Sequence, residues 1–310
     1  MPPVQLLGLV SPPGPAPDHC ARAPRGPIGY GPRVIEDTSS IPGAVCWIDA
    51  SSPDPAASRD FYTGLFGWTY LVDPDPSSGH YTTALCRGQP VAGLAGVPAS
   101  DGQPAAWTLY LASADVTYVV EVLNRWGGRV LYGPADVAGR GTVLVGADPT
   151  GAVVGFWQAV SPWPFGTVDP GSLIWAELNT WDGALADEFF ATLFGYEQHQ
   201  IGDGRSVDYT TWSRGGRTML GRLQMTESWA GDIPAHWMLH FAVDPEIGTD
   251  AVVNRVIELG GRVDVYPYDS ELGRIARVTD PFGAAFALID PTRRIEPPAP
   301  SSIADEAGYL

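Results

Sequence analysis

The segment that decides the fold begins at Cys46 and reads CWIDASSPDPAASRDFYTGLFGWTY through Tyr70. A second version, IWAELNTWDGALADEFFATLFGYEQ, occupies residues 174–198, so that Trp47 and Trp175 stand 128 positions apart. The offset grows to 132 where DPTGA at 148–152 aligns with DPFGA at 280–284. Self-similarity at a nearly constant spacing is the signature of a repeated structural unit. We therefore interpret the chain as a tandem duplication.

Each copy has the same predicted order of elements. An apolar strand (44–50 or 172–179) leads to a helix that ends at Leu-Phe-Gly, where glycine suits the left-handed cap. Three short strands follow, then a strand, a second helix (115–126 or 249–259) closed by Gly-Gly, and three more strands. Each copy thus reads βαβββ twice. Strands with one apolar face and helices outside them predict an α+β fold, in which four βαβββ units form two curved-sheet cups.

The repeat also predicts the domain limits, with a first domain at 42–162, a second at 170–292 and a tail at 293–310. Residues 1–41 hold nine prolines and no periodic apolar pattern, so we expect an irregular N-terminal arm. The sequence leaves two states of this arm open. It is either a disordered tail or an ordered segment that packs on the globular part through leucines such as Leu6 and Leu9.

Composition and charge exclude several classes of partner. The chain carries 18 Lys and Arg against 35 Asp and Glu, a net charge of −17. Nucleic acids and anionic membranes are bound by a surplus of basic residues, so we expect neither as a partner. Three cysteines without a CxxC pair, and an apolar start without a basic segment, indicate a reducing, cytoplasmic protein.

The motifs FYTGLFGW, GGRV and DPTGA or DPFGA, in this order and repeated, resemble the vicinal oxygen chelate superfamily. That group includes glyoxalase I, bleomycin-resistance proteins and extradiol dioxygenases, and the likeness is greatest to its fused two-domain actinobacterial members. It covers about residues 42–292. The resemblance implies the curved-sheet fold, but it leaves the activity open because the fold hosts isomerases, oxygenases and drug-binding proteins.

The metal enzymes of this superfamily carry ligands on the cup side of the first, fifth and eighth strands, and in some members on the fourth. Carried over by position, the ligand sites of the first copy fall on Trp47, Thr108 and Gly155. Those of the second copy fall on Trp175, Met238 and Ala287, and the fourth strands hold no carboxylate. A divalent ion needs several N, O or S donors that converge on it. We therefore expect no metal and no other cofactor.

Strand alternation assigns residues to the cup faces. Aromatic rings beside a few polar groups favour a flat, largely apolar small molecule as the ligand. Asp49, Glu177 and His240 are the candidate catalytic acids and bases, since a carboxyl or imidazole in an apolar cup titrates nearer neutrality. The candidate substrate-binding residues are Trp47, Tyr81, Tyr110, Trp157, Trp175, Asn179, Tyr209 and Arg222.

Each of these candidates also has a purely structural interpretation. Trp47 and Trp175 would then fill the cups as core residues. Asp49 and Glu177 would be carboxylates satisfied by backbone or arginine groups, and His240 a satisfied, non-catalytic histidine. The sequence leaves both interpretations open. For Arg222 it allows two roles equally, pairing with a carboxylate or orienting a ligand oxygen.

Two classes of function remain, with a metal-dependent lyase or dioxygenase third. The first is a cofactor-independent, secondary-metabolite tailoring enzyme that performs acid/base dehydration, cyclisation or isomerisation on an aromatic polyketide-like molecule. The second is an antibiotic-binding or resistance protein that sequesters such a molecule unchanged. The asymmetric polar residues of the two cups, with Tyr110 aligned with His240, favour the enzyme. We expect a monomer or weak homodimer, because a fused pair completes its own cups.

Overall fold

A computed structural model describes residues 41–97, 105–137, 139–161, 165–166, 170–202, 204–205 and 207–295. The predicted N-terminal arm and most of the predicted tail lie outside these residues. The first copy comprises β1 (Val45–Ser52), α1 (Pro55–Phe66), β2 (Thr69–Val72), a short 3-10 helix (Pro76–Ser78), β3 (Thr82–Cys86), β4 (Gln89–Gly96), β5 (Ala106–Ala112), α2 (Val116–Trp126), β6 (Arg129–Val137), β7 (Gly141–Ala147) and β8 (Val153–Ala159).

The second copy repeats this order of strands and helices. It comprises β9 (Leu173–Thr180), α3 (Gly183–Phe194), β10 (Glu197–Ile201), β11 (Tyr209–Arg214), β12 (Arg217–Gln224), β13 (His236–Ala242), α4 (Thr249–Glu258), β14 (Arg262–Ser270), β15 (Gly273–Thr279) and β16 (Ala285–Asp290). Among the described residues no helix is both long and apolar enough to cross a membrane.

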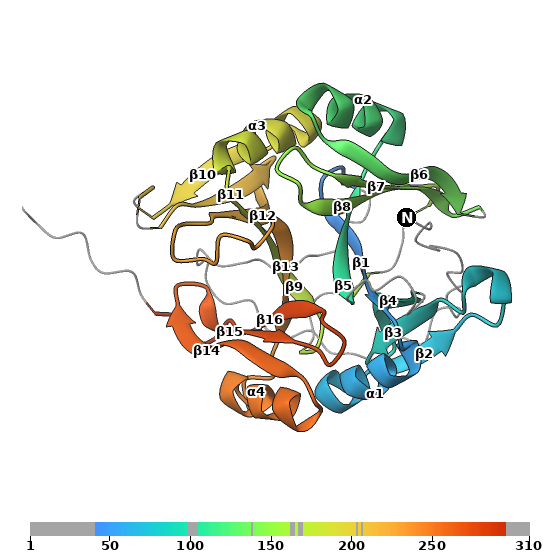
Figure 1. Cartoon of the computed structure of the whole chain (residues 1–310), viewed down its shortest axis with the longest axis vertical. Helices are drawn as coiled ribbons and strands as arrows, with labels where there is room; N and C mark the ends of the chain where they lie inside the picture. Colours follow the sequence, from blue (N-terminus) through green and yellow to red (C-terminus); the bar gives the residue numbers. More distant parts are fainter. Residues whose placement is uncertain are drawn as a thin grey trace, which may run out of the picture.

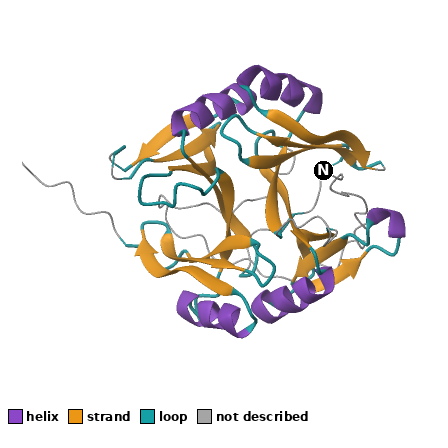
Figure 2. Cartoon of the chain, in the orientation of Figure 1, coloured by secondary structure: helices purple, strands orange, loops and turns teal. Residues whose placement is uncertain are grey.

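Each copy forms one eight-stranded sheet, and the two sheets have the same topology. Their strand orders are β2-β3-β4-β1-β5-β8-β7-β6 and β10-β11-β12-β9-β13-β16-β15-β14. The two central strands of each sheet pair antiparallel, and each central strand pairs parallel with the last strand of its own unit. The sheets curve in opposite directions, with the helices on their outer sides (Figures 1 and 2). This confirms the duplicated α+β architecture.

The first helix of each copy begins and ends for the same local reasons. The side chain of Asp54 accepts a hydrogen bond from the Ala57 amide, and Asp182 caps α3 in the same way. Such a cap satisfies one of the amides left open at a helix start. Gly67 ends α1 with a φ of 70°, a left-handed conformation that glycine adopts without steric cost.

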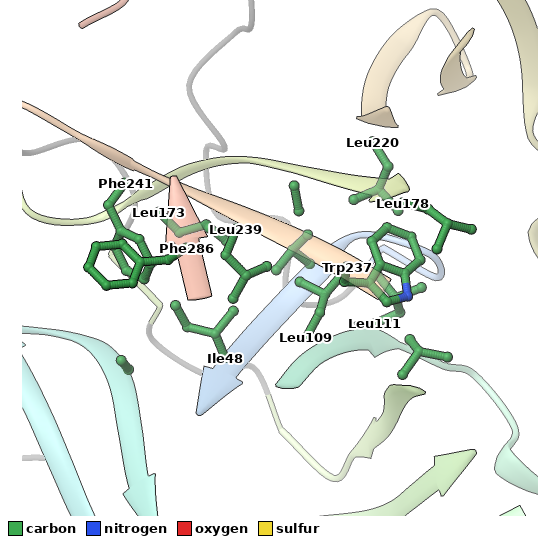
Figure 3. Packing of buried hydrophobic residues seen from close by; sticks show 14 of the residues in the cluster. Ile48, Leu109, Leu111, Leu173, Leu178, Leu220, Trp237, Leu239, Phe241 and Phe286 are labelled. Carbon is green, nitrogen blue, oxygen red and sulfur yellow. The ribbon is translucent and has the colours of Figure 1, made fainter. Parts of the chain in front are cut away.

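The two copies share one hydrophobic core. The outer faces of the central strands pack back to back, so that Ile48 and Leu109 of the first sheet lie near Leu239 of the second (Figure 3). Around this core α1 lies against α4, and α2 against α3. The Tyr62 hydroxyl donates to Asp280 across the interface at 2.9 Å. The shared core leaves the concave faces on opposite sides of the molecule, away from the interface.

Candidate functional site

The first candidate site lies on the concave face of the β1–β8 sheet, where a carboxyl group meets two phenols. Asp49 of β1 accepts hydrogen bonds through Oδ2 from the hydroxyls of Tyr110 at 3.1 Å and Tyr81 at 3.5 Å. The indole Nε1 of Trp47 donates to the Tyr81 hydroxyl oxygen at 2.8 Å. All four side chains are buried. The strand alternation therefore brings together these four predicted residues.

Burial dominates the ionisation of Asp49. Loss of water raises the pKa of this carboxyl to about 7, although the hydrogen bonds from Tyr110 and Tyr81 lower it in part. The cluster that surrounds it is apolar and consists of Cys46, Ala112, Val137, Val143, Val145 and Trp157. The predicted residue Trp157 thus lies in the wall of this cup. Asp49 can hold or release a proton near neutral pH.

Small residues make room for the buried phenols. A Cβ atom on Gly93 would lie 1.8 Å from the Tyr81 hydroxyl oxygen, and one on Gly155 would lie 2.2 Å from the Tyr110 ring. In the second sheet a Cβ atom on Gly221 would lie 2.2 Å from the Tyr209 hydroxyl oxygen. Atoms cannot approach this closely, so these backbone positions fix the phenols in both cups.

The second candidate site, on the concave face of the β9–β16 sheet, repeats this arrangement with different partners. The indole Nε1 of Trp175 donates to the Tyr209 hydroxyl oxygen at 2.8 Å, as Trp47 does in the first sheet. The Tyr209 hydroxyl also lies beside Glu177, which stands in the place of Asp49. His240 takes the place of Tyr110, with its Nε2 3.5 Å from Oε1 of Glu177.

Glu177 differs from Asp49 in its charge. Burial alone would raise the pKa of Glu177, but the imidazole of His240, the guanidinium of Arg277 and the Tyr209 hydroxyl outweigh it. The pKa of Glu177 therefore lies below its ordinary value. Nη2 of Arg277 lies 4.0 Å from Oε1 of the same carboxylate. Glu177 is ionised at neutral pH, next to two groups that can carry positive charge.

Several polar atoms of the second cup are buried without a partner. Neither ring nitrogen of His240 has a hydrogen bond of good geometry among the described residues, although its Nε2 lies 3.5 Å from the Glu177 carboxylate. Asn179 donates through Nδ2 to Nε2 of His236 at 3.3 Å when that nitrogen is unprotonated, but its Oδ1 has no partner in the described chain. Buried polar atoms are normally satisfied, so the second cup is built to meet a further polar group.

The remaining predicted residue, Arg222, lies outside both cups. On β12 it follows Gly221 and therefore projects from the opposite face of the sheet. Its buried guanidinium pairs with Asp187 at 2.6 Å and with Asp208 at 2.7 Å, and it also donates to Thr210. Arg222 stabilises the contact between α3 and the sheet, and the structure does not bring it together with the other candidates.

Sequence reasoning missed Arg277 and Trp229. Arg277 lies on β15 opposite Ala287, and Trp229 lies in the loop between β12 and β13 (Figure 1). The Arg277 guanidinium stacks over the indole ring of Trp229, with its Cζ 4.4 Å from the ring centroid. In the strand GRIARVT, Arg277 stands two residues after Ile275 and therefore lies on the same face of the strand. This position of a charged residue was the available signal for Arg277. Nothing in the loop sequence singles out Trp229.

The positions that carry metal ligands in related enzymes do not fit a metal ion here. In the first sheet Trp47 donates its indole N–H to Tyr81, and the Tyr110 ring fills the space beside Gly155. The corresponding positions of the second sheet are Trp175, Met238 and Ala287. An indole, a thioether and a methyl group are no ligand set for a hard or borderline divalent cation. Among the described residues no group of three or more His, Cys, Asp or Glu side chains could hold a metal ion.

Comparison with known proteins places these observations in a family. Residues 45–156 match the Glyoxalase/Bleomycin resistance protein/Dioxygenase superfamily. The chain is 38% identical over 267 residues to the anthracycline biosynthesis protein DnrV of Streptomyces peucetius, with 82% of this chain and 95% of the relative covered. It is 34% identical over 254 residues to the putative glyoxylase CFP32 of Mycobacterium tuberculosis, with 80% and 95% covered.

Solved structures share the fold at low sequence identity. The 2,2',3-trihydroxybiphenyl 1,2-dioxygenase of Sphingomonas wittichii strain RW1 superposes with a TM-score of 0.55 at 13% identity, covering 80% of this chain and 90% of that enzyme. The Mn(II)-bound glyoxalase of Novosphingobium aromaticivorans gives 0.55 at 15% identity, with 84% and 89% covered. The motifs, the duplicated curved sheets and these relatives show that the chain belongs to the glyoxalase/bleomycin resistance protein/dioxygenase superfamily.

Proposed function

We propose that this protein is a metal-independent, secondary-metabolite tailoring enzyme that performs acid/base chemistry on an aromatic polyketide-like molecule in the second cup. One observation carries the proposal. His240 is buried, its Nε2 faces the Glu177 carboxylate, and its Nδ1 has no partner in the described chain. A base oriented by a carboxylate on one nitrogen and open on the other is the arrangement that proton transfer requires.

The proposed reaction follows from these two side chains. His240 removes a proton from a carbon next to a substrate carbonyl, and the electron pair of that C–H bond moves into an enolate. Glu177, ionised at neutral pH, stabilises the imidazolium that forms. The imidazolium then returns the proton, either to a departing β-hydroxyl, which releases water, or to a different atom, which gives isomerisation. Proton transfer of this kind contributes roughly 10²–10⁴-fold to a rate.

The substrate class rests on the cup walls and on the relatives. Buried aromatic and aliphatic side chains surround the polar groups of both cups. Two relatives at 38% and 37% identity are anthracycline biosynthesis proteins, and anthracyclines are polycyclic aromatic compounds. A flat aromatic ketone fits such a site, since its rings bury apolar area and its carbonyl and hydroxyl oxygens meet the few polar atoms.

A binding role remains the second candidate, and the first cup favours it. Hydrogen bonds link Trp47 to Tyr81 and join both Tyr81 and Tyr110 to Asp49, and burial, not a cationic neighbour, sets the pKa of Asp49. A group of phenols, an indole and a carboxyl suits stacking and hydrogen bonding. This cup would sequester an aromatic molecule without changing it.

Liquid chromatography coupled to mass spectrometry separates these roles, since isomers of equal mass differ in retention time. Hydroxyketone precursors of polycyclic aromatic polyketides are incubated with the purified protein in excess EDTA, and products are sought that are isomeric with the substrate or lighter by one water. We expect His240→Gln to lower turnover by roughly 10²–10⁴-fold. The matched control is Tyr110→Phe, at the equivalent position of the first sheet, which leaves turnover nearly unchanged. Ligands that bind and are recovered unchanged contradict the enzyme and support sequestration.

A further inference from the structure

Arg277 is a partly buried cation that forms no hydrogen bond with the described residues. Its side chain is 16% exposed, and its guanidinium makes no hydrogen bond with any residue that the structure describes. Arg222, in the same sheet, donates to Asp187, Asp208 and Thr210. A guanidinium has five N–H donors in a rigid planar fork, and those of Arg277 meet no acceptor among the described residues. The donors of Arg277 are therefore available to a ligand.

The neighbours of Arg277 orient this fork. Its guanidinium lies over the Trp229 indole at 4.4 Å, which holds one face of the cation against the ring. A stacked guanidinium keeps its N–H groups in the plane, where they point away from the ring. The ring of His236 also lies near Trp229, with ring centroids 6.1 Å apart. The loop that carries Trp229 thus holds the Arg277 guanidinium near the Glu177 carboxylate of the cup.

Protein groups balance the charge in the second cup only while the imidazole of His240 is neutral. Among the described residues Glu177 is the one carboxylate within ion-pair distance of Arg277, and it also faces His240. When both ring nitrogens of His240 carry a proton, the imidazole is a cation. It then shares the Glu177 carboxylate with Arg277. An anionic group from outside the chain would restore neutrality, and a bidentate oxyanion matches the guanidinium fork in shape.

The subsite is within reach of solvent, unlike the rest of the cup. Trp229 is partly exposed. Tyr268, whose pKa is lowered in part by the charge of Arg277, is 40% exposed. Glu177 and His240 are almost fully buried deeper in the same face. In the first sheet the strand position that corresponds to Arg277 holds the apolar Val145.

We propose that Arg277 and Trp229 form a recognition subsite for an anionic oxygen carried by a planar aromatic substrate. The anion is a carboxylate or an ionised phenol or enol, which engages the guanidinium edge while the ring system packs along Trp229. The assignment rests on the proposed function for the substrate and names its class more narrowly. It places the anionic end of the substrate near the cup mouth and the reacting carbon near His240.

Matched ligand pairs test the subsite by binding alone. Anthraquinone-2-carboxylate is compared with its carboxamide, and 2-hydroxyanthraquinone, at a pH where the phenol is ionised, with 2-methoxyanthraquinone. Dissociation constants are measured by calorimetry. We expect the anion of at least one pair to bind about 10- to 100-fold more tightly than its neutral partner, the range for a charged hydrogen-bonded group. The pair that shows this preference identifies the source of the anion.

Substitutions assign the preference to the two residues. Arg277→Met removes the preference and leaves affinity for the neutral partner unchanged, and Arg277→Lys retains only part of it because an ammonium lacks the fork. Trp229→Ala weakens anion and neutral ligand alike, by roughly 2- to 10-fold. Arg274→Met is the control: Arg274 lies on the same strand but is already paired with Asp250 and Asp269.

The outcomes separate this inference from the proposed function. An anion preference that disappears in Arg277→Met, without turnover of any hydroxyketone, supports the subsite and contradicts the enzyme. Turnover that depends on His240 but is accompanied by equal affinity for anion and neutral partner overturns the subsite alone. Absence of binding by all four probes also overturns the subsite. So does an anion preference that persists in both Arg277→Met and Arg277→Lys, provided that near-ultraviolet circular dichroism shows the two variants to be folded.

Discussion

The two cups of this protein are built on one skeleton and differ in a few side chains. In both, an indole donates to a phenol and the phenol meets a carboxyl group on the same central strand. Asp49 then meets a second phenol, whereas Glu177 meets an imidazole and a guanidinium. Duplication thus preserved the hydrogen-bonded frame and changed what surrounds the carboxyl group.

This difference shows that burial alone does not determine the charge of a carboxyl group. Both acids are almost fully buried, yet the pKa of Asp49 is raised to about 7 and the pKa of Glu177 is lowered. Desolvation is the largest influence on each. It prevails at Asp49, where only phenols oppose it, and is outweighed at Glu177 by two cationic side chains.

The largest expected effect comes from replacing each acid by its amide. The pKa of Asp49 rises from 3.8 to about 7 on folding. The stabilisation that the protonated carboxyl contributes is therefore complete below pH 3.8 and is lost as the pH rises to about 7. The free energy of unfolding of Asp49→Asn, relative to the wild type, should therefore increase by about 4 kcal/mol between these pH values. Urea unfolding at a series of pH values measures it.

Glu177→Gln should show the opposite slope. The lowered pKa of Glu177 means that its contribution is present above the ordinary value and is lost as pH falls through the lowered one. The variant should therefore lose stability relative to the wild type as pH rises through this range. Glu258→Gln, an exposed acid paired with Arg255, serves as the control and should change little. Slopes of equal sign at the two acids would refute the comparison.

A smaller loss of stability, equal in the two cups, is expected from changes at positions where the cups are alike. Gly93→Ala and Gly221→Ala each push a methyl group into a phenol, at 1.8 Å and 2.2 Å from the hydroxyl oxygen. Each should cost about 1–3 kcal/mol of stability through overpacking. Gly231→Ala, which meets no atom within 4 Å, is the control. Thermal unfolding measures all three, and a loss in one cup alone would show that the frame is not shared.

The smallest effect should come from metal ions. Neither set of ligand positions offers converging donors, so Mn²⁺, Fe²⁺ or Zn²⁺ should shift the melting temperature of the EDTA-treated protein by less than about 1 °C. His240→Gln is the control, because adventitious binding at the His240–Glu177 pair would disappear in that variant. A larger shift that persists there, or turnover that requires the added ion, would restore the metal-dependent alternative.

Most of the cup face could be predicted because it depends on local alternation. Once Trp47 and Trp175 are assigned to the concave side, every second residue of their strands follows. The positions of the two arginines relative to the cup were harder to predict. Arg222 resembled a ligand-orienting residue but projects from the other face and is saturated by Asp187 and Asp208. Arg277 reaches Glu177 only because β15 pairs with β16 and the sheet curves, which brings together residues 100 positions apart.

The sequence by itself determined the duplication, the order of strands and helices, and the identity of the side chains on each concave face, since these follow from repeats, periodicity and capping residues. Only the tertiary structure decided which acid keeps its proton and which arginine faces the cup. Ionisation depends on burial and on charges contributed by distant strands. Neither quantity is encoded in the local pattern around Asp49 or Glu177.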